Sequence, residues 1–119
     1  MKKEYIRDYT VAMFRYYAMH GKPSADEILK LKKELSAAAI LDLEAVDNTL
    51  RSLDSESKKA VEEVYFVNPE RKYRRNEIEQ RVIKFSIAHH IDRSNTYRKL
   101  KEARRICAQK RNLNLSVYW

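Results

Sequence analysis

Two helical runs meet at a short polar break within the stretch IAHHIDRSNTYRKLKEA, residues 87–103. A stripe of apolar residues at helical spacing precedes the break, from Ile78 to Ala88, and a second stripe follows it, from Thr96 to Cys107. The break itself is only three or four residues long. Because two helices joined by so short a turn form a helix-turn-helix arrangement, this stretch predicts the fold of the C-terminal half.

The rest of the chain has the composition of an all-α protein. Its 119 residues are the size of one domain, and one glycine and two prolines are too few for the turns of a sheet protein. We predict about six helices, the first over residues 3–20 with Gly21 just past its end. The next four helices have polar candidates for their N-terminal caps, and these are Ser24 or Asp26, Asp42, Asp54 or Ser55, and Asn76. The last helix is predicted to begin near Ser94.

These runs divide the chain into three predicted segments. Residues 1–41 form an N-terminal helical segment, residues 42–112 the helix-turn-helix DNA-binding domain, and residues 113–119 a tail. The N-terminal segment is rich in tyrosine, and we expect these side chains to fill the core, an exposed aromatic surface being the alternative. They are Tyr5, Tyr9, Tyr16 and Tyr17.

Positive charge is concentrated in one part of the sequence. Residues 71–111 hold fourteen Lys or Arg against four acids, whereas the other residues hold eleven against thirteen. A localised basic block is typical of proteins that bind a polyanion, because each neutralised phosphate releases condensed counterions. The charge pattern therefore predicts double-stranded DNA as a partner.

Several other functions are not expected from the composition. A single cysteine, Cys107, provides no disulfide framework, and no stretch approaches the roughly 18 apolar residues of a membrane span. We therefore expect a cytoplasmic protein without membrane contact. One glycine cannot build a phosphate-binding loop, and the adjacent His89 and His90 cannot share a helical face as metal ligands do. No enzymatic activity, metal or cofactor is expected.

The last helix supplies the candidate binding residues. Its outward face is predicted to carry Asn95, Arg98, Lys99, Glu102 and Arg105. Since Arg pairs with guanine and Asn with adenine, the predicted base-reading residues are Arg93, Asn95 and Arg98. The residues predicted to contact the DNA backbone are Arg74, Arg75, Lys99, Lys101 and Arg105. Asp92 and Arg93 stand where such turns often have glycine and an apolar residue, and Asp tolerates the left-handed conformation that the turn needs.

Three short runs carry a family resemblance: LRSL at 50–53, AVEEVYF at 60–66 and SNTYRKLKEA at 94–103. Together they resemble the sigma-factor domain that reads the upstream promoter element and, more closely, the ArpU-like phage late-transcription regulators. The likeness covers about residues 43–112. It implies control of phage or prophage transcription, with RNA polymerase as a second partner.

Two other functions fit the same residues. One is a phage DNA-packaging or architectural DNA binder, and the other is an interaction module whose basic block contacts RNA or an acidic protein. A single recognition helix reads few base pairs, so we also predict a homodimer on DNA, joined through residues 5–17 or the aromatic tail.

Overall fold

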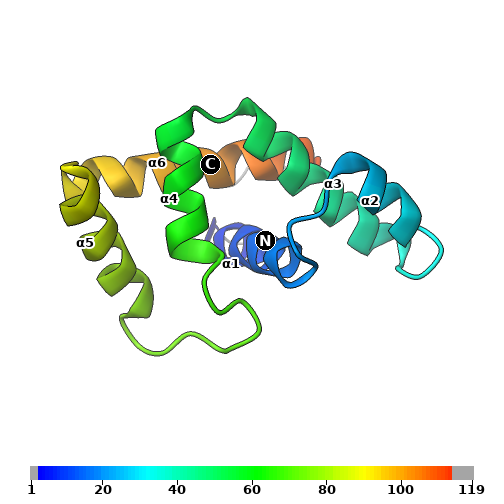
Figure 1. Ribbon diagram of the computed structural model, residues 1–119, viewed down its shortest axis with the longest axis horizontal. Coiled ribbons are helices and arrows are strands. Elements are labelled where there is room, and N and C mark those ends of the chain that lie inside the picture. The colour runs from blue at the N-terminus through cyan, green and yellow to red at the C-terminus, as the bar shows by residue number, and fades with distance from the viewer. Residues whose placement is uncertain (1–2, 114–119) are drawn as a thin grey trace.

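Six helices account for the architecture of residues 3–113, the part of the chain that the computed structural model describes (Figure 1). In chain order they are α1 (Lys3–Met19), α2 (Ala25–Leu31), α3 (Ala37–Ser52), α4 (Ser55–Tyr65), α5 (Glu77–His89) and α6 (Arg93–Lys110). No strand occurs in this range, so the predicted all-α fold of about six helices is confirmed. None of the six helices has the length and apolar character needed to cross a membrane.

Local hydrogen bonds set several helix ends where the sequence predicts them. Ser24 begins α2 with a capping box, in which its Oγ accepts from the Glu27 N–H at 3.3 Å and the Glu27 carboxylate accepts in return. Asp54 caps α4 by accepting from the Ser57 N–H at 2.7 Å. Gly21, with φ +76°, ends α1 in a Schellman motif, as expected of a residue without a Cβ.

The start of α3 differs from the prediction that Asp42 caps it. The helix begins six residues earlier, after Ser36, whose Oγ accepts from the backbone N–H three residues on at 3.2 Å. The three alanines that follow are the strongest helix formers, which favours this early start. Asp42 lies inside the helix and accepts hydrogen bonds from Tyr9 at 3.0 Å and from Arg111 at 2.7 Å.

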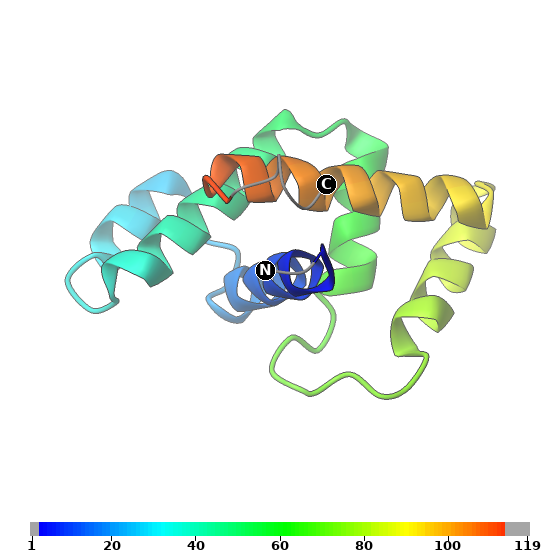
Figure 2. The ribbon, with the colours of Figure 1, turned by 180° about the vertical axis from the view of Figure 1, so that it is seen from behind.

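α6 is the helix around which the others pack. It contacts α1, α3, α4 and α5, and Figure 2 shows it running across the molecule with α1 beside it and α5 turning away from its N-terminal end. Leu100, Ala103 and Cys107 on its inner face are fully buried. The predicted apolar stripe of this helix therefore faces α1, α3 and α4 as well as α5.

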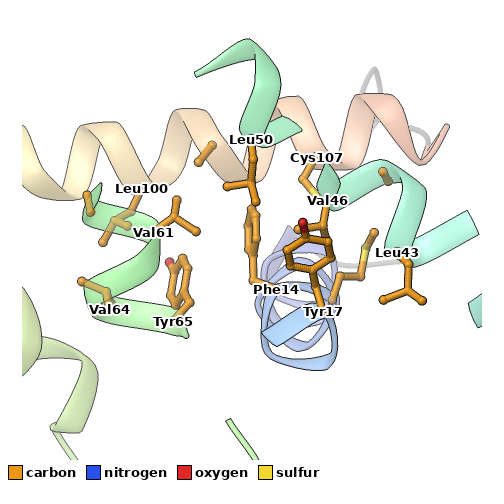
Figure 3. Close-up of a cluster of buried hydrophobic side chains, with 14 of the residues drawn as sticks. Phe14, Tyr17, Leu43, Val46, Leu50, Val61, Val64, Tyr65, Leu100 and Cys107 are labelled. Atoms are coloured by element: carbon orange, nitrogen blue, oxygen red, sulfur yellow. The ribbon is translucent and has the colours of Figure 1, made fainter. Parts of the chain in front are cut away.

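The core joins the N-terminal and C-terminal parts of the chain. Figure 3 shows side chains of α1, α3, α4 and α6 converging on one cluster. Within it Phe14 is stacked on Tyr65, with ring centroids 5.5 Å apart and an interplanar angle of 12°. The predicted segment boundary between residues 41 and 42 lies inside α3, and α1 contributes to the same core as the C-terminal helices.

The N-terminal tyrosines belong mostly to this core. Tyr17 is 4% exposed and donates a hydrogen bond to the Pro23 carbonyl at 3.0 Å, whereas Tyr9 and Tyr16 are half-buried. Tyr5 is exposed. The predicted aromatic tail contact falls on residues 114–119, which lie outside the described part of the chain.

Candidate nucleic-acid interface

The turn between α5 and α6 has a well-defined backbone geometry. His90 takes the left-handed conformation, with φ +55° and ψ 45°. The N–H of His90 donates to the Ile87 carbonyl, and the N–H of Ile91 donates to the Ser86 carbonyl at 3.0 Å. These two bonds form a Schellman motif, in which the left-handed residue is usually glycine.

The left-handed residue of this turn is therefore His90 and not Asp92. Asp92 has φ −59° and ψ 143°, an extended conformation that precedes the first turn of α6. The apolar residue that follows the left-handed position is Ile91, which packs against the core. The glycine and apolar residue usual in such a turn are thus replaced by His90 and Ile91. The predicted positions, Asp92 and Arg93, lie two residues later.

A buried hydrogen bond fixes α5 against α6. The hydroxyls of Ser86 and Thr96 lie 2.8 Å apart, and Thr96 has no exposed surface. Thr96 Oγ1 also lies 3.3 Å from the carbonyl of Asp92, the residue before α6. Because both helices and the turn contribute atoms to this small network, their relative orientation depends on it.

The outward face of α6 carries several of the predicted contact residues. Arg98 and Lys101 are exposed, and neither forms an ion pair with another described side chain. Arg105 lies further along the same face and is paired with Glu102, with Nε and Oε2 3.0 Å apart. This guanidinium lowers the pKa of the Glu102 carboxyl.

The three predicted base-reading residues do not share one face. Successive residues of an α-helix are about 100° apart, so Asn95 and Arg98 project roughly 60° from each other and Arg93 roughly 140° from Arg98. Arg93 instead lies 3.7 Å from Glu79 of α5. The helix therefore brings Asn95 and Arg98 together and directs Arg93 to its flank.

The predicted backbone contacts are also divided between different places. Lys99 is turned toward the start of α4, where its ammonium lies 2.9 Å from Glu56, and its side chain is only 25% exposed. Arg74 and Arg75 are exposed and line a cavity of about 650 Å³ formed by α4, the connector of residues 66–76 and α5. No residue of α6 lines this cavity.

Glu77 organises the basic wall of that cavity. Both of its carboxylate oxygens accept from Arg71 at 2.9 Å, the Arg74 N–H donates at 3.0 Å, and Arg81 also pairs with it. These bonds lower the pKa of Glu77 to about 2, and the hydrogen bond from the Arg71 side chain makes the largest contribution. Asn76 precedes α5 as predicted, but it takes the left-handed conformation and its side chain makes no capping bond.

Lys84, which is not among the residues predicted to contact DNA, also lines this cavity. It lies on α5 about one turn beyond Arg81. The only local signal for this wall was the i,i+4 spacing of Glu77 and Arg81, which is common on solvated helices.

Two further observations concern metal-binding groups and the cysteine among the described residues. No group of three or more His, Cys, Asp or Glu side chains is placed to hold a metal ion there. Burial raises the pKa of the Cys107 thiol to about 12, so this thiol is protonated at neutral pH. The sequence matches no protein-family model, no curated protein and no solved structure at a significant level.

Proposed function

We propose that the protein binds double-stranded DNA through α5 and α6 as a helix-turn-helix, with α6 in the major groove, and that it catalyses no reaction. The observation that carries the proposal is the joint between the two helices. A three-residue turn, closed by a Schellman motif and the Ser86–Thr96 hydrogen bond, leaves Arg98 and Lys101 exposed on α6. In this motif the exposed N-terminal part of the second helix meets the base edges.

The geometry supports different roles for the candidate residues. Arg98 and Asn95 share a face near the start of α6, which suits bidentate contacts to guanine and adenine. Lys101 and Arg105 continue that face and suit phosphate contacts, Arg105 after exchanging Glu102 for a phosphate. Arg93 and Lys99, each beside a carboxylate of another helix, are less suited to the same groove.

The regulatory part of the proposal rests on the sequence resemblance. Likeness to the ArpU-like and sigma-factor domains supports a cytoplasmic, sequence-specific transcription regulator of phage or prophage origin that contacts RNA polymerase. A packaging or architectural DNA binder is the second candidate. It is favoured by the cavity lined by Arg74 and Arg75, because these arginines would add phosphate contacts away from α6. The two candidates differ in sequence preference.

The test begins with selection of bound duplexes from a random pool at near-physiological salt. Arg98→Ala should then weaken binding to the selected duplex by about 1–3 kcal/mol and relax the preference at one base position. Lys101→Ala removes the same charge from the same face and should weaken binding to selected and random duplexes equally. The slope of log affinity against log salt concentration should become shallower by about one, because one phosphate contact is lost. A pool without an enriched sequence would favour the architectural binder, and no binding to any duplex would contradict the proposal.

We further propose that two copies bind one duplex, because one recognition helix reads only a few base pairs. Light scattering of the protein with saturating duplex gives the stoichiometry directly. Two chains per duplex are expected, and one chain per duplex would rule out the homodimer.

A further inference from the structure

A second cavity lies on a part of the molecule that the DNA proposal does not use. It has a volume of about 530 Å³ and is bounded by α1, α4, the 66–76 connector, α5 and α6. This volume is within the range of about 300–1,000 Å³ typical of small-molecule sites. None of the residues assigned to DNA lines it. Its polar and aromatic walls are formed by Arg7, Arg15, Arg104, Tyr65, Tyr73 and Tyr97.

Two of the three arginines of this cavity, Arg15 and Arg104, have no acidic partner among the described residues. Arg104 donates to the Tyr65 hydroxyl at 2.8 Å, and Arg15 donates to the carbonyls of Pro69, at 3.0 Å, and Arg71. Neither forms an ion pair with a described carboxylate, and the Nε atom of each is buried without a hydrogen-bond partner among the described residues.

The charge of the cavity wall is therefore unbalanced. Asp8 is the one carboxylate of the described lining, and it faces Arg7 across 3.4 Å in an exposed pair. Arg15 and Arg104 are left with neutral partners in a partly buried setting. Because a buried charge without a counter-charge is unfavourable, an anion in this cavity would be stabilised by both guanidinium groups.

Aromatic side chains lie beside these charges, and Tyr97 is the most exposed of them. The Tyr73 ring packs against two guanidinium groups, with its centroid 4.0 Å from Cζ of Arg15 and 4.8 Å from Cζ of Arg81, and its hydroxyl donates to the Tyr65 carbonyl at 3.1 Å. Tyr97 is 40% exposed and reaches the cavity from α6. Fixed aromatic rings stack on planar groups, and guanidinium groups bind carboxylate or phosphate through paired donors.

We propose that this cavity binds a small planar aromatic anion, a ring system that carries a phosphate or a carboxylate. Tyr97 and Arg104 both lie on α6, so the bound anion would contact the helix assigned to DNA. That consequence rests on the proposed function, whereas the binding site itself does not. Binding is therefore tested without DNA.

The experiment is calorimetric titration of the full chain with adenosine 5′-monophosphate and with 1-naphthoate. These probes carry a phosphate and a carboxylate, respectively, and identify which anion is preferred. Two control compounds separate the contributions of adenosine 5′-monophosphate. Adenosine has the same ring system without the charge, and inorganic phosphate has the charge without a ring. We expect one-to-one binding of at least one aromatic anion, tenfold or more tighter than either control compound.

Two variants locate the binding. Arg104→Gln removes one guanidinium and should weaken binding at least tenfold, and Ala12→Trp, at an exposed position on the cavity wall, should do the same by filling the space while keeping every charge. Lys30→Gln removes a charge from an exposed position on α2, a helix that does not border the cavity, and should change the affinity less than twofold.

Far-UV circular dichroism and thermal melting establish that each variant is folded. Failure of both aromatic anions to bind at millimolar concentration would overturn the proposal. Binding that folded Ala12→Trp and Arg104→Gln both retain would also overturn it, because the site would then lie elsewhere.

Discussion

His90 makes the turn between α5 and α6 in a conformation that is unfavourable for its residue type. Residues with a Cβ pay about 1–2 kcal/mol in the left-handed region, although His, Asn and Asp are found there more often than others. Three of the five non-glycine residues with positive φ in the described chain are asparagines, and His90 is one of the two others. The two Schellman hydrogen bonds hold it in place.

Replacing His90 with glycine should therefore stabilise the protein. We expect the free energy of unfolding to rise by about 0.5–1 kcal/mol, because relief of the left-handed strain exceeds the added entropy of the unfolded chain. Urea denaturation followed by far-UV circular dichroism measures the change. Ala88→Gly, at an exposed helical position two residues earlier, should lower the same free energy by about 1 kcal/mol. A loss in both variants would contradict the left-handed assignment.

Glu77 gives the protein a predicted dependence on acid pH. Its pKa is lowered from 4.5 to about 2 by hydrogen bonds from Arg71 and the Arg74 N–H and by the charge of Arg81. A carboxylate with a lowered folded-state pKa contributes stability that is present above its unfolded pKa and is lost as the pH falls toward the folded value. The loss should therefore occur between about pH 4.5 and pH 2.

The variant Glu77→Gln removes this titration. As the pH is lowered from 4.5 to 2, the free energy of unfolding of this variant should fall less steeply than that of the unchanged protein. The difference in slope should correspond to at most about one fewer proton bound on unfolding. Chemical denaturation at a series of pH values gives both curves. Parallel curves would show that Glu77 does not stabilise the connector through its ionised form.

At the scale of elements, α5 and α6 are joined by few but buried contacts. The hydrogen bond between the Ser86 and Thr96 hydroxyls, 2.8 Å long, is a polar contact within this buried interface. An unsatisfied buried hydroxyl costs about 1–3 kcal/mol of stability. Removal of either hydroxyl should therefore destabilise the protein by leaving the other without its partner.

A double-mutant cycle with Ser86→Ala and Thr96→Val tests this coupling. Each single variant should lose about 1–2 kcal/mol of unfolding free energy, and the two losses should differ from additivity by about 0.5–1.5 kcal/mol. Ser52→Ala, which removes an exposed hydroxyl bonded to the carbonyl four residues earlier, should change stability by less than about 0.5 kcal/mol. Additive losses would mean that the two hydroxyls do not interact in solution.

At the scale of the whole molecule, the N-terminal helix is part of the structure that supports α6. Phe14 is fully buried and stacked on Tyr65, which in turn accepts a hydrogen bond from Arg104 of α6. α1 therefore supports α6 both by direct contact and through Tyr65 of α4. A DNA-binding unit confined to residues 42–112 would lack this layer and the first turns of α3.

The expected consequence is a large effect of Phe14→Ala on the entire protein. Loss of this buried ring should lower the free energy of unfolding by about 3–5 kcal/mol in a single cooperative transition. Met19→Ala on the same helix, where the side chain is 54% exposed, should change it by less than about 0.5 kcal/mol. If circular dichroism of Phe14→Ala showed an independent transition for the C-terminal helices, the two parts would be separate folding units.

The sequence by itself determined the features that depend on nearby residues. The helical class follows from composition, and the ends at Gly21, Ser24 and Asp54 depend on hydrogen bonds that span a few residues. The exposure of Arg98 and Lys101 follows in the same way from the 3.6-residue period of α6. Such contacts are present in any chain that forms these helices.

Only the tertiary structure decided the features that depend on how the helices cross. Asp42 pairs with Arg111, 69 residues away, and Lys99 is drawn toward Glu56 at the start of α4. The cavity with Arg15, Arg104 and three tyrosines likewise combines residues from both ends of the chain. The period of a helix shows which face is buried but not which helix will cover it, because that choice depends on side-chain packing among all six elements.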